Sequence, residues 1–252
     1  MIQVEGIFSG GSDISAPIIG RDFNWTGGDG TYQVRDDGDG NWRIKFLSSG
    51  TFTPLKDMVI DAFLVGAGGG GHQQLFYGNG GGGGYTKTVK SIVLTANTTY
   101  NIVVGAGGLT NSGSGESAIP ATAGGDTSAF SETVAGGAAG ASKAGGNGGS
   151  GGGSYNSKKE VGYAGGSDGS NGGGTNGGTG QGTTTREFGE ADGDLYAGGG
   201  GGYYSQSPGA GGPGGGGDYN EDGEANTGGG GGAGSAGGSG IVIIRKHKEA
   251  AA

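Results

Sequence analysis

Apolar and polar residues alternate along the stretch Trp42–Leu47, where Arg43 and Lys45 separate the apolar side chains. This two-residue period is typical of a β-strand that buries one face. The stretch Val59–Val65 is apolar almost throughout, and Ile241–Arg245 is rich in β-branched residues. Both stretches therefore predict strands that are buried on at least one face.

Shorter patterns predict further strands between these. Tyr85–Val89 and Ile92–Leu94 indicate one strand or a bulged pair, and Thr99–Val104 indicates another strand. Thr127–Val134 shows the weakest alternation. No stretch of useful length shows the 3.6-residue period of an amphipathic helix. Six or so strands with almost no α-helix predict an all-β fold built around a small β-sandwich.

Glycine accounts for 73 of the 252 residues and changes this picture, because most of it lies between residues 61 and 240. Such a composition without a strict period usually indicates a flexible linker or disorder. Here, however, the glycines form dense blocks, and segments rich in aromatic and charged residues separate them. The blocks are Gly68–Gly71, Gly80–Gly84, Gly151–Gly153, Gly198–Gly202, Gly214–Gly217 and Gly228–Gly232.

The blocks lie between predicted strands, so both ends of the glycine-rich region are held in place. Extended glycine segments, which have no Cβ, can pack side by side as polyglycine II helices and hydrogen-bond to several neighbours. Dense hydrogen bonding of this kind offsets the entropy lost on ordering glycine. The sequence therefore predicts a large glycine-rich insertion in the sandwich, packed as polyglycine II-like helices, with disorder as the alternative.

The resulting domain organisation has four parts. Residues 1–41 form an N-terminal attachment segment, and residues 42–135 with 241–246 form the β-sandwich. Residues 136–240 form the glycine-rich bundle with recognition loops, and residues 247–252 form a C-terminal tail.

The net charge of −9 argues against nucleic-acid binding, which requires clustered Lys and Arg. No apolar stretch approaches 18 residues, so we expect no membrane insertion, and the first 20 residues lack the pattern of a signal peptide. Cysteine is absent, which excludes disulfides, thiol nucleophiles and cysteine zinc sites.

Motifs that carry catalytic chemistry are weak in this sequence. His72 and His247 lie in unrelated contexts, which argues against a catalytic triad or a histidine metal site. Four acidic residues between 187 and 194 could hold a carboxylate pair for glycan cleavage, although acids in a glycine-rich loop more often form a solvated tip. These are Glu187, Glu190, Asp192 and Asp194. We therefore expect that the protein is not an enzyme and that it needs no cofactor.

A weak calcium candidate lies at Asp218, Asn220 and Asp222, whose spacing matches the first half of a calcium loop. The twelfth position, which should be a bidentate Glu, is Gly229. Asx-Gly turns explain the same residues, so we predict no metal site beyond this weak calcium candidate.

Five characteristic segments follow one another between residues 42 and 246. In chain order they are WRIKFLSSGTFT, VIDAFLVGAGGGG, GGGGGYTKTVKSIVLTANTTYNIVVGAGG, GGDTSAFSETVAGG and GGSGIVIIR. In this order they resemble the glycine-rich domain of tailed-phage tail fibre and receptor-binding proteins. The glycine blocks with aromatic loops also resemble the distal long-tail-fibre adhesins of T-even-like phages. That resemblance implies a polyglycine II bundle whose loop tips contact a protein or saccharide of the host surface. It also implies a virion protein made in the host cytoplasm.

Aromatic and amide residues near the glycine blocks are the candidate receptor-binding residues, because tyrosine gives large amphipathic contact area at low entropic cost. They are Gln74, Phe76, Tyr77, Tyr155, Tyr163, Tyr196, Tyr203, Tyr204 and Tyr219. The alternative is that these tyrosines cap the ends of the bundle and shield it from water.

The sequence thus predicts a virion tail-fibre or receptor-binding adhesin that contacts a bacterial surface protein or glycan. Residues 1–41 would attach it to other virion tail or fibre proteins, and a homotrimer is possible. The alternative is a structural fibre, spacer or decoration protein without receptor recognition. A secreted ice-binding protein is a third hypothesis, but it requires a flat, repetitive Thr/Ala face, whereas these loops are charged and irregular.

Overall fold

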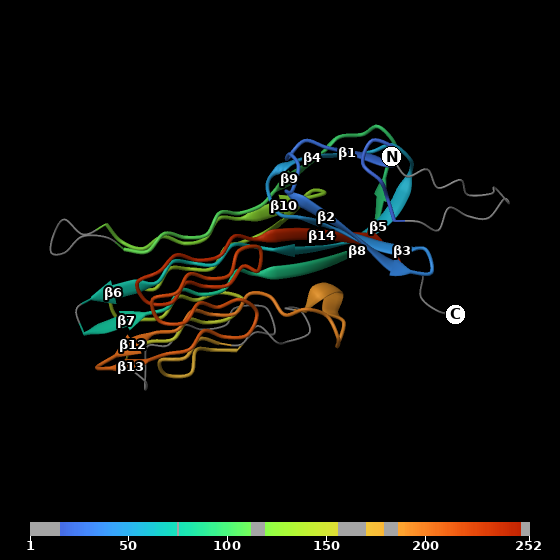
Figure 1. Ribbon diagram of the computed structural model, residues 1–252. Coiled ribbons are helices and arrows are strands. Elements are labelled where there is room, and N and C mark those ends of the chain that lie inside the picture. The colour runs from blue at the N-terminus through green and yellow to red at the C-terminus, as the bar shows by residue number, and fades with distance from the viewer. Residues whose placement is uncertain (1–15, 75, 112–118, 156–169, 179–185, 248–252) are drawn as a thin grey trace, which may run out of the picture.

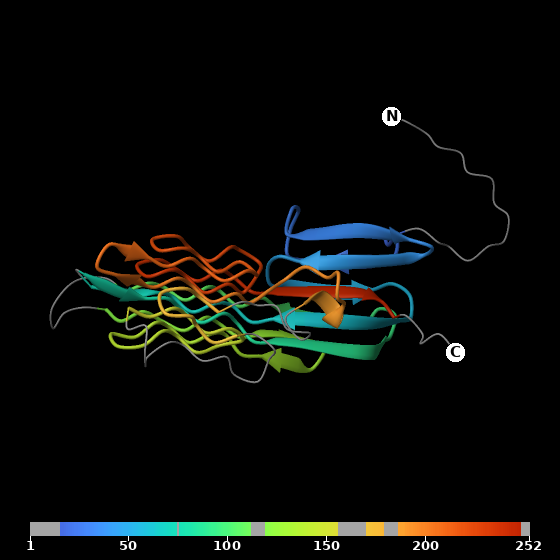
Figure 2. The same ribbon diagram turned by 90° about the horizontal axis from the view of Figure 1, so that it is seen from below.

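The computed structural model describes residues 16–74, 76–111, 119–155, 170–178 and 186–247. The molecule is elongated, with two β-sheets at one end and long glycine-rich segments running side by side toward the other end (Figure 1). Figure 2 shows the same division from below. Pro17 and His247 line one pocket at the sandwich end, so the two ends of the described chain meet there.

The first sheet has the antiparallel order β1-β4-β9-β10-β11. Its strands are β1 (Phe23–Trp25), β4 (Gly50–Pro54), β9 (Tyr100–Val103), β10 (Thr127–Ala129) and β11 (Glu132–Val134). The stretch Thr127–Val134, whose apolar and polar residues alternate most weakly, thus forms a hairpin of two short strands, β10 and β11. Phe130 and Ser131 adopt positive φ at its turn.

The second sheet has the antiparallel order β2-β3-β14-β5-β8. Its strands are β2 (Tyr32–Gly38), β3 (Asn41–Phe46), β14 (Ile241–Lys246), β5 (Met58–Val65) and β8 (Thr86–Leu94). The C-terminal strand β14 lies at the centre, which explains why its residues Ile241–Ile244 are apolar and buried on both faces. β8 is one strand with a register shift opposite Asp61, and Ser91 has a φ of 58° there.

Two strands lie within residues 1–41, which the sequence analysis assigned to a separate attachment segment. β1 pairs with β4, and β2 pairs with β3, so each belongs to one sheet of the sandwich. Phe23 and Trp25 point into the core, which needs their large side chains to fill the space next to Phe52 and Phe46. The β-sandwich therefore begins well before residue 42.

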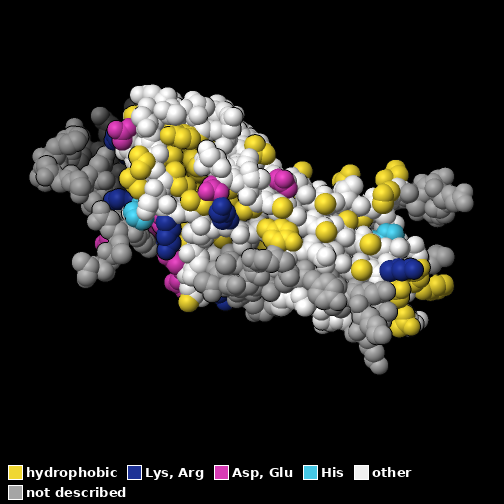
Figure 3. Space-filling model, turned by 180° about the vertical axis from the view of Figure 1, so that it is seen from behind, with side chains coloured by type: hydrophobic (Ala, Val, Ile, Leu, Met, Phe, Trp, Pro, Cys, Tyr) yellow, Lys and Arg dark blue, Asp and Glu magenta, His cyan; other side chains and the backbone are white. Residues whose placement is uncertain are grey.

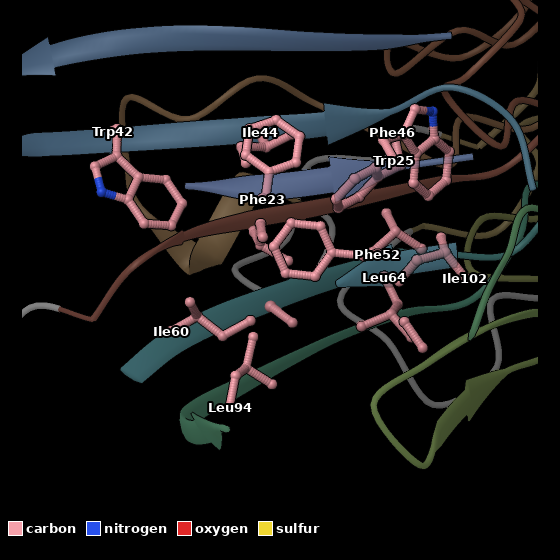
Figure 4. Packing of buried hydrophobic residues seen from close by; sticks show 14 of the residues in the cluster. Phe23, Trp25, Trp42, Ile44, Phe46, Phe52, Ile60, Leu64, Leu94 and Ile102 are labelled. Carbon is pink, nitrogen blue, oxygen red and sulfur yellow. The ribbon is translucent and has the colours of Figure 1, made fainter. Parts of the chain in front are cut away.

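The main core lies between the two sheets and is built from alternate residues of facing strands (Figure 4). Phe23 and Phe52 of the first sheet have ring centroids 5.5 Å apart, and Phe46 of the second sheet lies 5.5 Å from Phe52. All three side chains are fully buried. Burial of large aromatic side chains contributes about 1.5–3 kcal/mol each.

A third, four-stranded sheet lies at the far end of the molecule, with the antiparallel order β13-β12-β7-β6. Its strands are β6 (His72–Gln74), β7 (Tyr77–Asn79), β12 (Tyr203–Tyr204) and β13 (Ser207–Pro208). Its strands are contributed by segments that leave glycine blocks, so the glycine-rich segments carry this sheet away from the sandwich (Figure 1).

Glycine segments between the sandwich and this third sheet bond sideways with a three-residue period. Along residues 66–71, backbone N–H groups three positions apart donate to the same neighbouring segment, with N···O distances of 2.8–3.1 Å. Gly66 and Gly69 donate to segment 82–85, Ala67 and Gly70 to segment 122–125, and Gly68 and Gly71 to segment 235–238. One segment therefore donates to three neighbouring segments, and its carbonyls accept hydrogen bonds from others, such as Gly137 and Gly140 to Ala67 and Gly70. This sideways bonding in all directions is the packing of polyglycine II.

Close approach of the segments explains why the residues are glycine. A Cβ on Gly81 would lie 2.0 Å from the Gly69 carbonyl oxygen, and one on Gly200 would lie 2.0 Å from that of Gly231. No side chain fits at such distances. The prediction of an all-β fold with almost no α-helix is confirmed: the helix that the structure describes is the 3₁₀ turn η3 (Glu187–Gly189). Among the described residues no helix is long and apolar enough to cross a bilayer.

Candidate functional site

The third sheet at the far end of the bundle, here called the distal sheet (β6, β7, β12 and β13), brings together most of the candidate recognition residues. Its register places Gln74 opposite Tyr77 and Tyr77 opposite Tyr204. Directly opposed residues project on the same face of a sheet. One face of the distal sheet therefore carries an amide and two tyrosines in a row.

Tyr155 packs against this row although it comes from a segment far along the chain. Its ring centroid lies 4.7 Å from that of Tyr77 and 6.2 Å from that of Tyr204. The backbone N–H of Tyr155 donates to Asn79 Oδ1 at 3.1 Å, which fixes the segment on β7. The Tyr77 hydroxyl donates to Gln74 Oε1. Three tyrosines therefore form one continuous aromatic surface.

The opposite face of the distal sheet carries a second aromatic pair. Tyr203 stacks on Tyr219 with ring centroids 4.2 Å apart and planes inclined by 13°. Gln73, two strands away in the same row, donates from Nε2 to the Tyr219 hydroxyl at 2.9 Å. This pair is more enclosed than the first row, because Gln73, Tyr203 and Tyr219 are all half-buried, whereas Gln74 and Tyr204 are exposed.

Two of these aromatic side chains are open to solvent. Phe76, in the β6–β7 connection, is 73% exposed, and Tyr204 is 53% exposed. Figure 3 shows apolar side chains gathered at this end of the bundle. An exposed apolar group rimmed by polar residues is typical of an interaction surface. Phe76 and Tyr204 are therefore the residues of the distal sheet that a partner can contact most directly.

A second strip of the surface, which the sequence analysis missed, runs beside the distal sheet. Asn111 accepts a hydrogen bond from the Gln73 N–H at 2.7 Å and donates to the Gln73 carbonyl at 3.0 Å. Leu109 and Ile119 are exposed on the same arm of the chain. Leu109 and Ile119 are isolated apolar residues, so the sequence shows no hydrophobic period that would mark them as a surface. The pairing of Asn111 with Gln73 in the folded chain is what places this strip beside the distal sheet.

Burial of His72 at the start of β6 keeps the distal sheet free of one charge. The ring is partly enclosed, and Nε2 is buried with no hydrogen-bond partner among the described residues. This desolvation lowers the pKa of His72, so the imidazole is neutral at pH 7.

Tyr196 lies away from the distal sheet and is buried, which corrects its place among the candidate surface residues. It is 4% exposed and lies against the sandwich, with its ring centroid 5.4 Å from that of Phe63. Its hydroxyl donates to Glu187 Oε2 at 3.2 Å, and burial together with that carboxylate raises the pKa of Tyr196. Tyr163 lies outside the described residues.

The acidic segment that contains Glu187 is not a solvated tip but covers the outer face of the second sheet. Glu187 is buried and pairs with Arg43 and Lys45, which are the basic residues of the alternating strand β3. Glu190 pairs in the same way with Arg245 of β14. These carboxylates hold the glycine-rich region on the sandwich, and this ion pairing accounts for the basic residues of β3.

The residues of the weak calcium candidate bond to backbone groups of neighbouring segments. Asp218 Oδ1 accepts the Gly211 N–H at 2.7 Å, and Asp222 Oδ1 accepts the Ala236 N–H at 2.8 Å. In the described part of the chain, no group of three His, Cys, Asp or Glu residues is arranged to hold a metal ion. Asp218 and Asp222 therefore act as turn and segment anchors.

A family model described as a glycine-rich domain matches residues 47–247. The match begins directly after β3, so it covers the bundle, the distal sheet and most of the sandwich, but not β1, β2 and β3. No curated protein sequence matches the chain.

Proposed function

From the premise that this chain belongs to the glycine-rich domain family, we propose that it is a virion tail-fibre or receptor-binding adhesin. In this proposal the sandwich is the base, the glycine bundle is a stiff stalk, and the distal sheet contacts a protein or glycan of the bacterial surface.

The observation that carries this proposal is the convergence of aromatic residues at the end of the bundle farthest from the sandwich. Tyr77, Tyr155 and Tyr204 come from three separate segments and form one surface. Beside it, Phe76 exposes most of its ring to water. A bundle that needed only stability would gain nothing from exposing large aromatic groups at its tip. Tyrosine-rich surfaces on a rigid scaffold suit recognition.

A structural role is the second candidate, and the stacked pair Tyr203 and Tyr219 favours it. These rings pack on each other and close the end of the bundle, with the Gln73 amide bonded to the Tyr219 hydroxyl. If closure were the only task of the tip, the protein would be a fibre, spacer or decoration protein of the virion. The two roles predict different results for the exposed residues.

Attachment to the virion is the role that we propose for the sandwich end, through residues 1–41 and neighbouring tail or fibre proteins. Of this segment, residues 16–41 include β1 and β2, which are integral to the sandwich. A homotrimer on a trimeric fibre is consistent with this arrangement. The proposal includes no cofactor, no nucleic acid and no membrane insertion.

Binding of the purified, fluorescently labelled protein to a panel of bacterial cells tests the proposal. We expect saturable binding to some strains, with at least a tenfold loss for Phe76→Ser and Tyr204→Ser. The matched control is Val34→Ser, which removes an exposed apolar side chain from β2 at the sandwich end. Protease treatment of the cells distinguishes a protein receptor from a glycan, which periodate oxidation destroys.

Two results would overturn the recognition role. One is the absence of saturable binding to every strain. The other is equal binding by the wild type and both tip variants. In either case the chain would be a structural virion component, and its detection by labelled antibody in a fibre shaft would agree with that role.

A further inference from the structure

Three side chains at the sandwich end form a continuous hydrogen-bonded chain. Ser91 Oγ lies 3.2 Å from His247 Nε2, and His247 Nδ1 lies 2.6 Å from Asp61 Oδ1. Ser91 is in the bulge of β8, Asp61 is in β5, and His247 directly follows β14. The serine and histidine are 156 positions apart in the chain, so only the fold brings them together.

The direction of the hydrogen bonds follows from the chemistry of the groups. An ionised carboxylate only accepts hydrogen bonds, so His247 Nδ1 must carry the proton that points to Asp61. In the neutral ring, Nε2 is then an acceptor, and the Ser91 hydroxyl donates to it. A hydroxyl that donates to an imidazole held by a carboxylate is the arrangement of an activated nucleophile.

Asp61 is held in the ionised state that this arrangement requires. It is 1% exposed, and burial alone would favour its protonated form. Hydrogen bonds from His247 and the Ser91 N–H, and an ion pair with Arg245, outweigh burial and lower the pKa of Asp61. Because Asp61 is fixed from three sides, it orients the imidazole toward Ser91.

Backbone geometry presents the serine outward. Ser91 adopts a φ of 58°, in the left-handed region that L-residues rarely occupy. The register shift in β8 sets this conformation, and the serine is exposed while its hydroxyl stays on the imidazole. Strained conformations of this kind gather at functional sites.

Apolar surface for a substrate lies next to the pair. Val59 and Val93 are directly opposite each other on β5 and β8 and are 41% and 71% exposed. The His247 N–H donates to the Val59 carbonyl, so imidazole and apolar surface are adjacent. Val59 and His247 also line a pocket of about 600 Å³, whose wall includes Trp42 and Met58.

We propose that Ser91, with His247 as its base and Asp61 as a positioning residue, is a nucleophile that attacks esters with an apolar acyl group. Ser91 Oγ bonds to the ester carbonyl carbon while its proton passes to His247 Nε2. The bond to the alcohol oxygen then breaks, and that oxygen takes the proton from His247, which leaves an acyl-serine. Water adds to the acyl-serine by the same proton transfers and releases the carboxylic acid.

This inference departs from the sequence analysis, which expected no catalytic triad because His72 and His247 lie in unrelated contexts. That expectation considered His247 only as the first residue of the C-terminal tail 247–252, whereas β14 places it beside β5. The site lies at the opposite end of the molecule from the distal sheet, so it does not depend on the proposed recognition role.

Labelling of the full chain with an alkyl fluorophosphonate tests the proposal, and peptide mass spectrometry identifies the labelled residue. We expect Ser91 to be labelled at least tenfold faster than Ser131. Ser131 is the matched control within the same molecule, because it is also exposed and has a φ of 65° but lies in the β10–β11 turn of the other sheet.

Variants give the second arm of the test. Ser91→Gly should abolish labelling and the hydrolysis of p-nitrophenyl butyrate, while glycine relieves the left-handed backbone and preserves the fold. His247→Gln should lower both rates at least tenfold. Equal labelling of Ser91 and Ser131, or unchanged rates in His247→Gln with an unchanged melting temperature, would overturn the proposal. The hydrogen bonds would then only fasten the end of β14 to the bulge.

Discussion

Arg43 of β3 and Glu187 of η3 form an ion pair across 144 positions of the chain, and Glu187 is almost fully buried in it. Lys45 and the Tyr196 hydroxyl bond to the other oxygen of the same carboxylate. The pair fastens the segment between the glycine blocks Gly151–Gly153 and Gly198–Gly202 onto the outer face of the sandwich. It makes the sandwich and the bundle parts of one folded unit.

Replacing Glu187 by Ala should therefore destabilise the whole protein. Arg43 and Lys45 would lose their buried partner, at a cost of about 2–4 kcal/mol in the free energy of unfolding. Chemical denaturation measures the change. The matched control is Asp194→Ala, since Asp194 also pairs with Lys45 but is mostly exposed, and its loss should cost less than about 1 kcal/mol. Equal costs for the two variants would contradict a docking role for Glu187.

The glycine segments of the bundle pack too closely to accommodate one added methyl group. In Gly81→Ala the new Cβ would lie 2.0 Å from the Gly69 carbonyl oxygen, so backbone segments must separate. We expect a loss of about 3 kcal/mol or more. The control is Gly173→Ala, where no atom of a described residue other than its chain neighbours lies within 4 Å of the new Cβ, and the change should stay within about 0.5 kcal/mol. Melting temperatures that fell equally would show that the packing is looser than this.

Acid should destabilise the sandwich through Asp22. This carboxylate accepts the Ile18 N–H and pairs with Arg21. Lys56 lies 3.0 Å from its other oxygen. Although burial favours the protonated form, these contacts lower the pKa of Asp22 to about 2.

In the unfolded chain the pKa of an aspartate is about 3.9, so that state binds more protons between about pH 4 and pH 2. Stability is then lost as the pH falls through that window, and at pH 7 Asp22 contributes about 2 kcal/mol. Asp22→Asn should remove this contribution and flatten the acid slope in urea titrations. Asp29→Asn, at an exposed position of the next loop, should change neither quantity.

Tyr203 and Tyr204 should differ in what they support. Tyr203 stacks on Tyr219, so Tyr203→Ala should cost about 1–2 kcal/mol of stability. Tyr204 is 53% exposed, so Tyr204→Ala should cost less than about 0.5 kcal/mol. Cell binding should respond in the opposite order, with the larger loss for Tyr204→Ala. If stability and cell binding both fell in Tyr203→Ala and neither fell in Tyr204→Ala, capping of the bundle would be the only role of the distal sheet.

Strands of the sandwich were predictable where their residues alternate or run apolar, as in β3, β5 and β14. The sequence analysis missed β2 because it is an edge strand, exposed along most of both faces, and Gln33, Arg35 and Asp36 leave no alternation. β1 has only three residues, too few for a period. Edge strands and very short strands form because a neighbouring strand is available to pair with them. The residues of one segment do not show whether such a neighbour exists.

The candidate residues were chosen by type, and type did not decide which of them would be exposed. Tyr196 and Tyr204 flank the same block, Gly198–Gly202, yet one is buried against Phe63 and the other is at the tip. Five residues in a polyglycine II conformation span about 15 Å, so the block carries the chain from the sandwich to the distal end. The sequence shows the block but not the direction in which it runs.

The three-residue period of the hydrogen bonds also limits how such a chain can change in length. Inserting one residue within segment 66–71 would turn all later N–H groups by about 120° and aim each at the wrong neighbour. Inserting three residues would restore every direction and push the excess into an end loop. A three-glycine insertion after Gly69 should thus preserve far more of the melting temperature than a one-glycine insertion. Length variation in a bundle of this kind is then quantised in triplets along the stalk, while the loops at its tip are free to vary by single residues.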